Sequence, residues 1–226
     1  RAVNIQGLNG ALQFNNNDLS LTNTSGRIGK SDFFLNGTFR NSITFMLFEN
    51  QPIGIEADLT SKHIELDELF EVLYGEETTN NYSFYISPNV NLNFNCDVGS
   101  LKYQRFTPDH IKGNLLIKNQ MAILRNISLN EHGGSFSLNG IVDARNQNAI
   151  DVVGTFSISD AHLDSIFYSF ENFKQDFIQD KHLKGQVTAD VTTEMTVNEN
   201  LRLLPETLVA DISATIRNGQ LNNFEP

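Results

Sequence analysis

The chain has 226 residues, a formal net charge of −11 and one cysteine. An acidic chain gains nothing from counterion release at a phosphate backbone, which argues against nucleic acid as a partner. One cysteine excludes an internal disulfide and a cysteine-based zinc site. No stretch approaches the roughly 18 apolar residues of a membrane span. Its first residues, RAVNIQGLNG, include no initiator methionine or signal peptide, so we expect a piece of a longer protein.

The first hundred residues show the pattern of strands. A two-residue hairpin turn is predicted at Asn16-Asn17, because asparagine tolerates positive φ. The apolar residues that follow alternate straight through a glycine, so one long strand is predicted, with a bulge or bend at that glycine. These apolar positions are Phe33, Leu35, Gly37 and Phe39.

A short helix and a further strand come next. The helix is predicted over residues 66–74, with Asp67 in its first turn, where the helix dipole favours a carboxylate. The sequence VNLNFNCDV at 90–98 alternates strictly, which is the period of a half-buried strand. Its apolar side is Val90, Leu92, Phe94, Cys96 and Val98.

The second hundred residues repeat this series. A hairpin turn is predicted at Asn119-Gln120, and a long strand with a bend at Gly140 follows it. The spacing of leucine, isoleucine and phenylalanine predicts a helix over 162–178, with Asp164 in its first turn. A third hairpin turn is predicted at Asn218-Gly219. The strand between the helix and this turn has an apolar side of Val187, Ala189, Val191, Met195 and Val197.

The likeness of the two halves is a sequence repeat. At an offset of 103 residues IGKSDFFLNG (28–37) matches EHGGSFSLNG (131–140), and the match continues without a gap back to Gly10. The offset then drops to 97, where ADLTSKHIELDELF (57–70) matches GTFSISDAHLDSIF (154–167). We therefore predict a first repeat unit over 1–102, a second over 103–200 and the beginning of a third over 201–226.

These patterns predict a mainly β fold. We expect an elongated, curved antiparallel sheet, built from two repeats of about a hundred residues, with two short helices. Two such helices cannot cover the apolar side of about a dozen strands. Either the sheet partly folds over on itself as a sandwich, or its apolar face stays open as a groove.

No catalytic or metal-binding motif appears in the sequence. Asp67 and Asp164 recur at helix starts, which explains them better than a pair of catalytic carboxylates does. HGGS at 132–135 superficially resembles an oxyanion loop, but its repeat counterpart GKSD at 29–32 indicates a turn. Cys96 is expected to be a buried small hydrophobe. We therefore predict a protein that is not an enzyme and has no cofactor. The histidines lack paired metal-ligand spacing; they are His63, His110, His132, His162 and His182.

The order of motifs resembles that of the AsmA-like family of bacterial envelope proteins. In that family a hairpin of the form G-x-L-x-I-x-N-G leads to a G-G-x-F-x-L-x-G strand, and a later strand runs into an L-D-x-L/I-F helical segment. The second unit carries these marks as IKGNLLIKNQ, GGSFSLNG and LDSIF, and the first as LNGALQF, GKSDFFLNG and LDELF.

This resemblance implies a location, a role and partners. Such proteins have a long periplasmic body behind an inner-membrane helix, which this sequence does not include. The body is an elongated, curved β-sheet with an apolar groove. The family is implicated in outer-membrane biogenesis and in moving phospholipid between the two membranes. The implied partners are phospholipid or another acyl-chain lipid and other envelope proteins, and the family has no catalytic motif to transfer.

A lipid groove needs alternation kept up over many strands and no catalytic residues. Each CH₂ of an acyl chain gains about 0.8 kcal/mol on leaving water, so a continuous apolar strip would shelter it. The alternative is a structural or adhesive β module, in which the same side chains pack on each other. The predicted lipid-groove residues are Phe33, Leu35, Phe39, Leu92, Phe94, Leu115, Ile117, Phe136, Leu138, Val191 and Met195.

Overall fold

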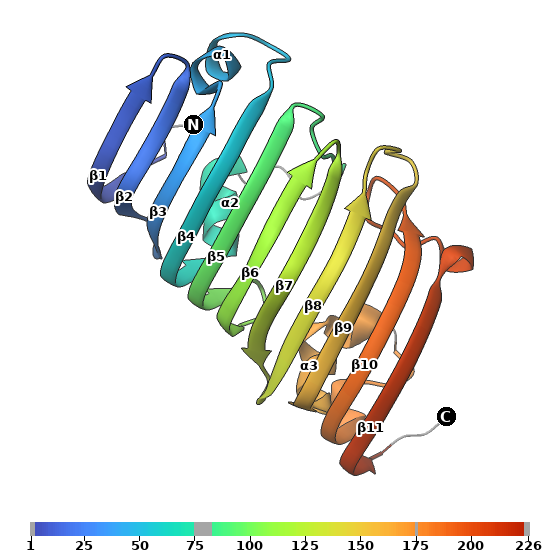
Figure 1. Ribbon diagram of the computed structural model, residues 1–226. Coiled ribbons are helices and arrows are strands. Elements are labelled where there is room, and N and C mark those ends of the chain that lie inside the picture. The colour runs from blue at the N-terminus through green and yellow to red at the C-terminus, as the bar shows by residue number, and fades with distance from the viewer. Residues whose placement is uncertain (1–2, 75–82, 175, 224–226) are drawn as a thin grey trace.

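A single open β-sheet makes up most of the molecule. The computed structural model describes residues 3–74, 83–174 and 176–223. Eleven strands form the sheet, and their order in space is their order along the chain (Figure 1). The predicted mainly β, curved sheet with short helices is confirmed. The strands are β1 (Ile5–Asn15), β2 (Asp18–Ile28), β3 (Ser31–Arg40), β4 (Ile53–Glu65), β5 (Val90–Lys102), β6 (Asp109–Lys118), β7 (Met121–Glu131), β8 (Gly134–Asp143), β9 (Ile150–His162), β10 (Leu183–Val197) and β11 (Val209–Leu221).

Three α-helices interrupt the strands in the described part of the chain. The helix predicted over 66–74 is confirmed as α2 (Leu66–Tyr74), and α1 (Ser42–Leu47) was not predicted. The helix predicted over 162–178 is too long, because α3 ends at Ser169. Glu171 and Asn172 have φ of 50° and 55°, which no α-helix accommodates, and the chain turns there. The short 3₁₀ segments are η2 (Glu171–Lys174), η3 (Asp180–His182) and η4 (Pro205–Thr207).

One neighbouring pair of strands is parallel, so the sheet is mixed rather than wholly antiparallel. Ile53 at the start of β4 pairs with Val90 at the start of β5, whereas every other pair is antiparallel. After β9 the chain returns from the same end of the sheet, so β10 is antiparallel to β9. The segments matched in the repeat, β5 and β10, therefore run in opposite directions. The sheet continues without a break across the expected unit boundaries, and the division into repeat units stays a prediction.

Bulges with positive φ occur in both halves of the sheet. The pairing of β2 with β3 skips a residue near Asn23, and the pairing of β7 with β8 skips one near Asn126. These asparagines have φ of 48° and 50°, a conformation that asparagine tolerates. Further shifts lie near Asp160 in β9 and Asn218 in β11, which also have positive φ. Bulges bend a strand and increase its twist, so these positions curve the sheet.

The repeated LNG phrase holds these bulges in place. The Asn36 side chain accepts a hydrogen bond from the Asn23 N–H at 2.7 Å, and Asn139 accepts one from Asn126 at 2.7 Å. The glycine after each asparagine lies in a regular stretch of pairing, so the prediction of one long strand through each glycine is confirmed. No bulge lies at Gly37 or Gly140, because the extra residue belongs to the preceding strand. The predicted bend at these glycines stays a prediction.

The hairpin turns are confirmed at two of the three predicted places. Asn16-Asn17 joins β1 to β2, and Asn119-Gln120 joins β6 to β7 with φ of 52° and 59°. The third turn, at Asn218-Gly219, is wrong because β11 runs through both residues. Asn218 has the same left-handed conformation as a turn asparagine, but here it forms a bulge opposite Gly185.

We expect Asn139→Ala to lower the free energy of unfolding by about 0.5–1.5 kcal/mol, because the Asn126 N–H loses its protein acceptor. Urea denaturation followed by circular dichroism measures this change. Asn139→Asp keeps an oxygen acceptor and serves as the control. If the alanine and aspartate variants are equally stable, the side-chain bond does not stabilise the bulge.

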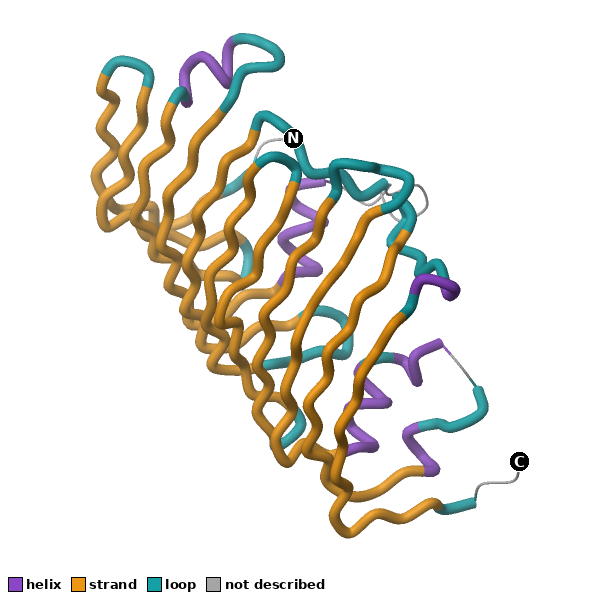
Figure 2. Tube along the Cα trace, turned by 45° about the vertical axis from the view of Figure 1, so that its right-hand side comes forward, coloured by secondary structure: helices purple, strands orange, loops and turns teal. Residues whose placement is uncertain are grey.

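Figure 2 shows that the strands turn at one end, so that the sheet curves around the side on which α2 and α3 lie. The alternation of apolar and polar residues along the strands identifies which face of the sheet lies on this side. α3 packs on Val187 and Ala189 of β10 and on Phe136 and Ile158 of neighbouring strands, all of which belong to the apolar face. The apolar face is therefore the inner side of the curve, and the asparagine-rich face is the outer side.

Candidate functional site

The inner face is apolar across the whole width of the sheet. Cross-strand pairs put Leu12 of β1 opposite Leu21 of β2, and Phe39 of β3 opposite Ile55 of β4. At the other end Val191 of β10 lies opposite Ile212 of β11. Because paired residues share a face, the apolar surface is continuous from the first strand to the last.

All eleven predicted groove residues lie on this inner face, and each is half-buried. Four of them form direct cross-strand pairs with one another. Leu92 and Phe94 of β5 pair with Ile117 and Leu115 of β6. The remaining candidates lie on β3, β8 and β10, namely Phe33, Leu35, Phe39, Phe136, Leu138, Val191 and Met195.

Two clusters of buried residues cover parts of the face. Ile166 of α3 packs with Ala161, Val187 and Ala189, and Phe136 packs against this cluster. The second cluster joins Ile86, from the segment before β5, to side chains at the opposite ends of the strands. Its members are Ile86, Ala122, Ala144, Ile150 and Val197, with Phe84, Leu115, Ile117, Val142 and Val152 beside them.

Much of the apolar surface stays accessible to solvent. The chain contains 17 phenylalanines, and among the described residues none is in the buried core. The largest fully buried side chains described are Ile150 and Pro108. The accessible surface is 14446 Å², whereas a compact monomer of 25.4 kDa has roughly 10,000 Å². The excess is what an open sheet with one uncovered apolar face produces.

Cys96 lies in the middle of the inner face. It pairs with Leu59 of β4 and Gly113 of β6. Burial raises the pKa of the Cys96 thiol, and the charge of Asp97 raises it further. The protonated thiol therefore contributes to the apolar surface as a small side chain and is a poor nucleophile, although it is half-buried and not buried as predicted.

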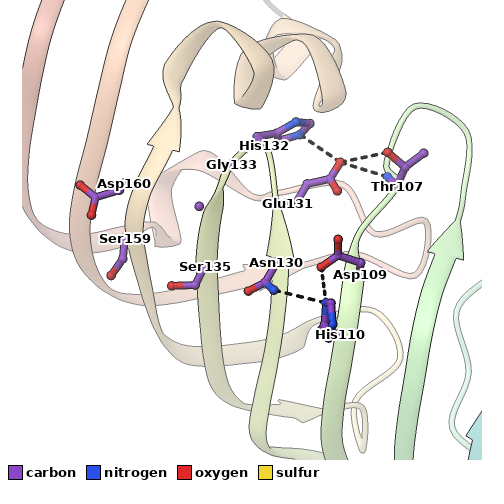
Figure 3. A pocket seen from close by; sticks show the side chains of 11 residues that line it. Thr107, Asp109, His110, Asn130, Glu131, His132, Gly133, Ser135, Ser159 and Asp160 are labelled. Carbon is purple, nitrogen blue, oxygen red and sulfur yellow. Dashed lines mark hydrogen bonds and ion pairs between the residues drawn. The ribbon is translucent and has the colours of Figure 1, made fainter.

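A polar hollow of about 710 Å³ surrounds the turn between β7 and β8, near the curved end of the sheet (Figure 3). Among its lining residues is Glu131, whose Oε1 accepts hydrogen bonds from the Thr107 N–H at 3.1 Å and hydroxyl at 3.4 Å. His132 Nε2 lies 3.3 Å from the same oxygen without forming an aligned hydrogen bond, and the contact is an ion pair only when the imidazole is protonated. Burial lowers the pKa of His132, although the nearby Glu131 and Asp164 oppose this.

These contacts give the hollow a structural role. Residues 132 and 133 form the turn between β7 and β8, so the interpretation of HGGS as a turn is confirmed. Glu131 ties this turn to Thr107, in the loop before β6. The buried carboxylate is thus satisfied by the protein itself.

The repeated aspartates also make local contacts. Asp67 in the first turn of α2 accepts a hydrogen bond from the Gln104 N–H at 2.7 Å. Asp164 in the first turn of α3 accepts one from the Ser165 N–H at 3.0 Å. Both aspartates lie in the first turn of a helix, as predicted, although Asp67 bonds to the loop after β5 and neither hydrogen bond caps a helix.

In the described ranges no group of three or more histidine, cysteine, aspartate or glutamate side chains has the arrangement of a metal site. None of the described helices combines the length and the apolar character of a bilayer span. No protein-family model matches the sequence, and none of the curated proteins compared with it does so either.

One surface feature was missed by the sequence reasoning. On the outer face Leu116, Ile123, Ile141 and Val153 pair in series across β6 to β9 and form an apolar row. Each belongs to a different strand, and each has at least one apolar neighbour in the chain, while Leu116 and Ile123 have one on both sides. Strict alternation is lost there, so the sequence pattern marks the row only as continuous apolar runs, which do not distinguish the faces.

Proposed function

We propose that the inner face binds the acyl chains of phospholipid or of another lipid. The observation that carries this proposal is an apolar face, continuous over eleven strands, on which the eleven candidate residues stay half-buried. A monomer rarely exposes a contiguous apolar patch beyond several hundred Å² unless the patch has a ligand or partner. A curved strip of this kind accepts an extended hydrocarbon chain along its length.

The energetics favour a lipid ligand. Moving a sixteen-carbon acyl chain from apolar surroundings into water costs on the order of 10 kcal/mol, at about 0.8 kcal/mol per CH₂. Contact with leucine, isoleucine and phenylalanine side chains removes much of that barrier. The sheet offers such contacts from neighbouring strands, so a bound chain moves along the face without crossing water.

Together with the family resemblance, this surface supports a specific role. We infer that the chain is a periplasmic segment of an AsmA-like protein, anchored through its parent protein in the inner membrane. Its role would be outer-membrane biogenesis by holding or transferring phospholipid between membranes. The chemistry requires no cofactor and no catalytic residue, and other envelope proteins would be its partners.

Native mass spectrometry of the purified chain tests the proposal. We expect mass additions that match co-purified phospholipid, and saturable binding of a fluorescent fatty acid after delipidation. A chain that carries no lipid and binds no fatty acid would instead support the structural or adhesive module.

A further inference from the structure

A further apolar surface lies at the end of the strands, on α1 and the residue that follows it. Phe45, Met46, Leu47 and Phe48 are consecutive, and the last three have exposed fractions of 65%, 69% and 62%. No charged residue lies between Arg40 and Glu49. We call these four residues the apolar tip. Four adjacent large apolar side chains in solvent are far from the scattered exposure that is normal on a surface.

Hydrogen bonds hold this short helix in a defined position. The Asn17 side chain accepts from the Thr44 N–H at 2.9 Å and donates to the Thr44 hydroxyl at 2.8 Å. Asp18 accepts from the Asn41 N–H at 2.9 Å, and the Ser42 hydroxyl donates to the Asn17 carbonyl at 3.0 Å. The exposure of the apolar tip is thus built into the fold and is not fraying of a chain end.

The apolar tip lies where the two halves of the chain differ. The connection from β3 to β4 covers residues 41–52, whereas the matching connection from β8 to β9 covers 144–149. This difference of six residues accounts for the drop in repeat offset from 103 to 97. The shorter connection reads ARNQNA and has no large apolar residue. The apolar tip is therefore absent from the matching turn, which offers an internal control.

The apolar tip adjoins the inner face at one end of the sheet. Figure 1 shows α1 at the end where β3 finishes and β4 begins, and α1 packs on β2 and β4. Phe39 and Ile53, which flank the connection in the sequence, both belong to the inner face. Apolar surface thus leads from the sheet toward the apolar tip.

We infer that the apolar tip inserts into the interfacial layer of a lipid bilayer. A short turn that projects several large apolar side chains fits a fluid layer, which adapts to its shape, better than a flat protein surface. The absence of charge across 41–48 suits a zwitterionic surface, since an anionic one would repel a chain with net charge −11. The inference rests on the proposed function for its purpose, which is to bring the lipid-binding face beside a membrane.

A single tryptophan tests the insertion, because the chain has none of its own. We expect the fluorescence of Met46→Trp to shift to shorter wavelength when phosphatidylcholine vesicles are added, and to be quenched by vesicles with brominated acyl chains. Gln147→Trp, in the matching polar turn, should show neither change. An unshifted Met46→Trp spectrum in the presence of vesicles would overturn the inference.

A second variant shows whether the apolar tip is what binds. Leu47→Glu should weaken co-flotation with phosphatidylcholine vesicles roughly tenfold or more, given the loss of one large apolar contact. Gln147→Glu adds the same charge in the matching turn and should leave flotation unchanged. Undiminished flotation of Leu47→Glu would show that another surface, such as the sheet face, contacts the vesicle. If the Met46→Trp fluorescence shifts when the protein concentration is raised in the absence of vesicles, the apolar tip forms a contact between copies of the chain instead.

The two proposals fail separately. Fatty-acid binding measured without vesicles reports the inner face, whereas Met46→Trp fluorescence reports only the apolar tip. Leu47→Glu should therefore retain fatty-acid binding. A chain that binds fatty acid but shows no Met46→Trp shift contradicts only the insertion, and the reverse result contradicts only the lipid-binding face.

Discussion

Replacing Phe94 with aspartate is expected to abolish fatty-acid binding while the chain stays folded. Phe94 lies at the middle of the inner face, where it pairs with Ala57 on one side and Leu115 on the other. It belongs to neither cluster of buried residues. An aspartate there remains hydrated in the lipid-free chain, but a bound acyl chain would strip its water at a cost of several kcal/mol. We expect at least a tenfold loss of affinity, measured by titration with a fluorescent fatty acid.

Asn91→Asp is the matched control for this experiment. It makes a similar change of charge on the same strand, three residues away and on the outer face. We expect its affinity to equal that of the wild-type chain. If Phe94→Asp unfolds the chain, Phe94 is a core residue, and the structural or adhesive module becomes the better account of the face.

The faces of the strands could be predicted because burial on one side imposes a period of two residues. β5 shows this clearly, since Leu92 and Phe94 are half-buried on the inner face while Asn91 and Asn93 are exposed on the outer one. All eleven groove candidates were placed on one face by the same reasoning. Alternation is a local property, so it needs no knowledge of which strands become neighbours.

The direction of β5 could not be predicted in the same way. Parallel or antiparallel pairing with β4 depends on where the chain returns after α2, and alternation is identical in both cases. The bulges could not be predicted from the sequence for a related reason. Asn23 and Asn218 have the same left-handed preference as a turn asparagine, and only the neighbouring strand decides that the residue is a bulge.

The sequence also could not predict how much of the inner face is covered by helices. Phe94 and Phe136 are both inward-facing phenylalanines in alternating strands, and no local pattern distinguishes them. α3 packs on the cluster that includes the second and not the first, because α3 follows β9 and lies over β8 to β10. The inner face is therefore divided into a core part and an accessible part by elements distant in sequence.

That division predicts the opposite result for Phe136→Asp, which we expect to destabilise the whole chain. Phe136 pairs with Leu129 and Ile158 and packs on the cluster formed by Ile166, Val187 and their neighbours. Removing a phenylalanine from such a cluster costs about 3–5 kcal/mol, before the cost of a carboxylate in the same place. Since domains are stable by only about 5–15 kcal/mol, most of the stability would be lost.

Urea denaturation followed by circular dichroism distinguishes the two aspartate variants. Phe136→Leu is the control, because a smaller apolar side chain in the same cluster should cost much less than the charged one. Equal stability of Phe136→Asp and Phe94→Asp would contradict a covered region beneath α3. A large gap between them, with fatty-acid binding lost in the folded Phe94→Asp variant, would separate the part of the face that stabilises the protein from the part that is open to lipid. The same sheet face serves both purposes because helix coverage, and not the strand pattern, decides which side chains meet solvent.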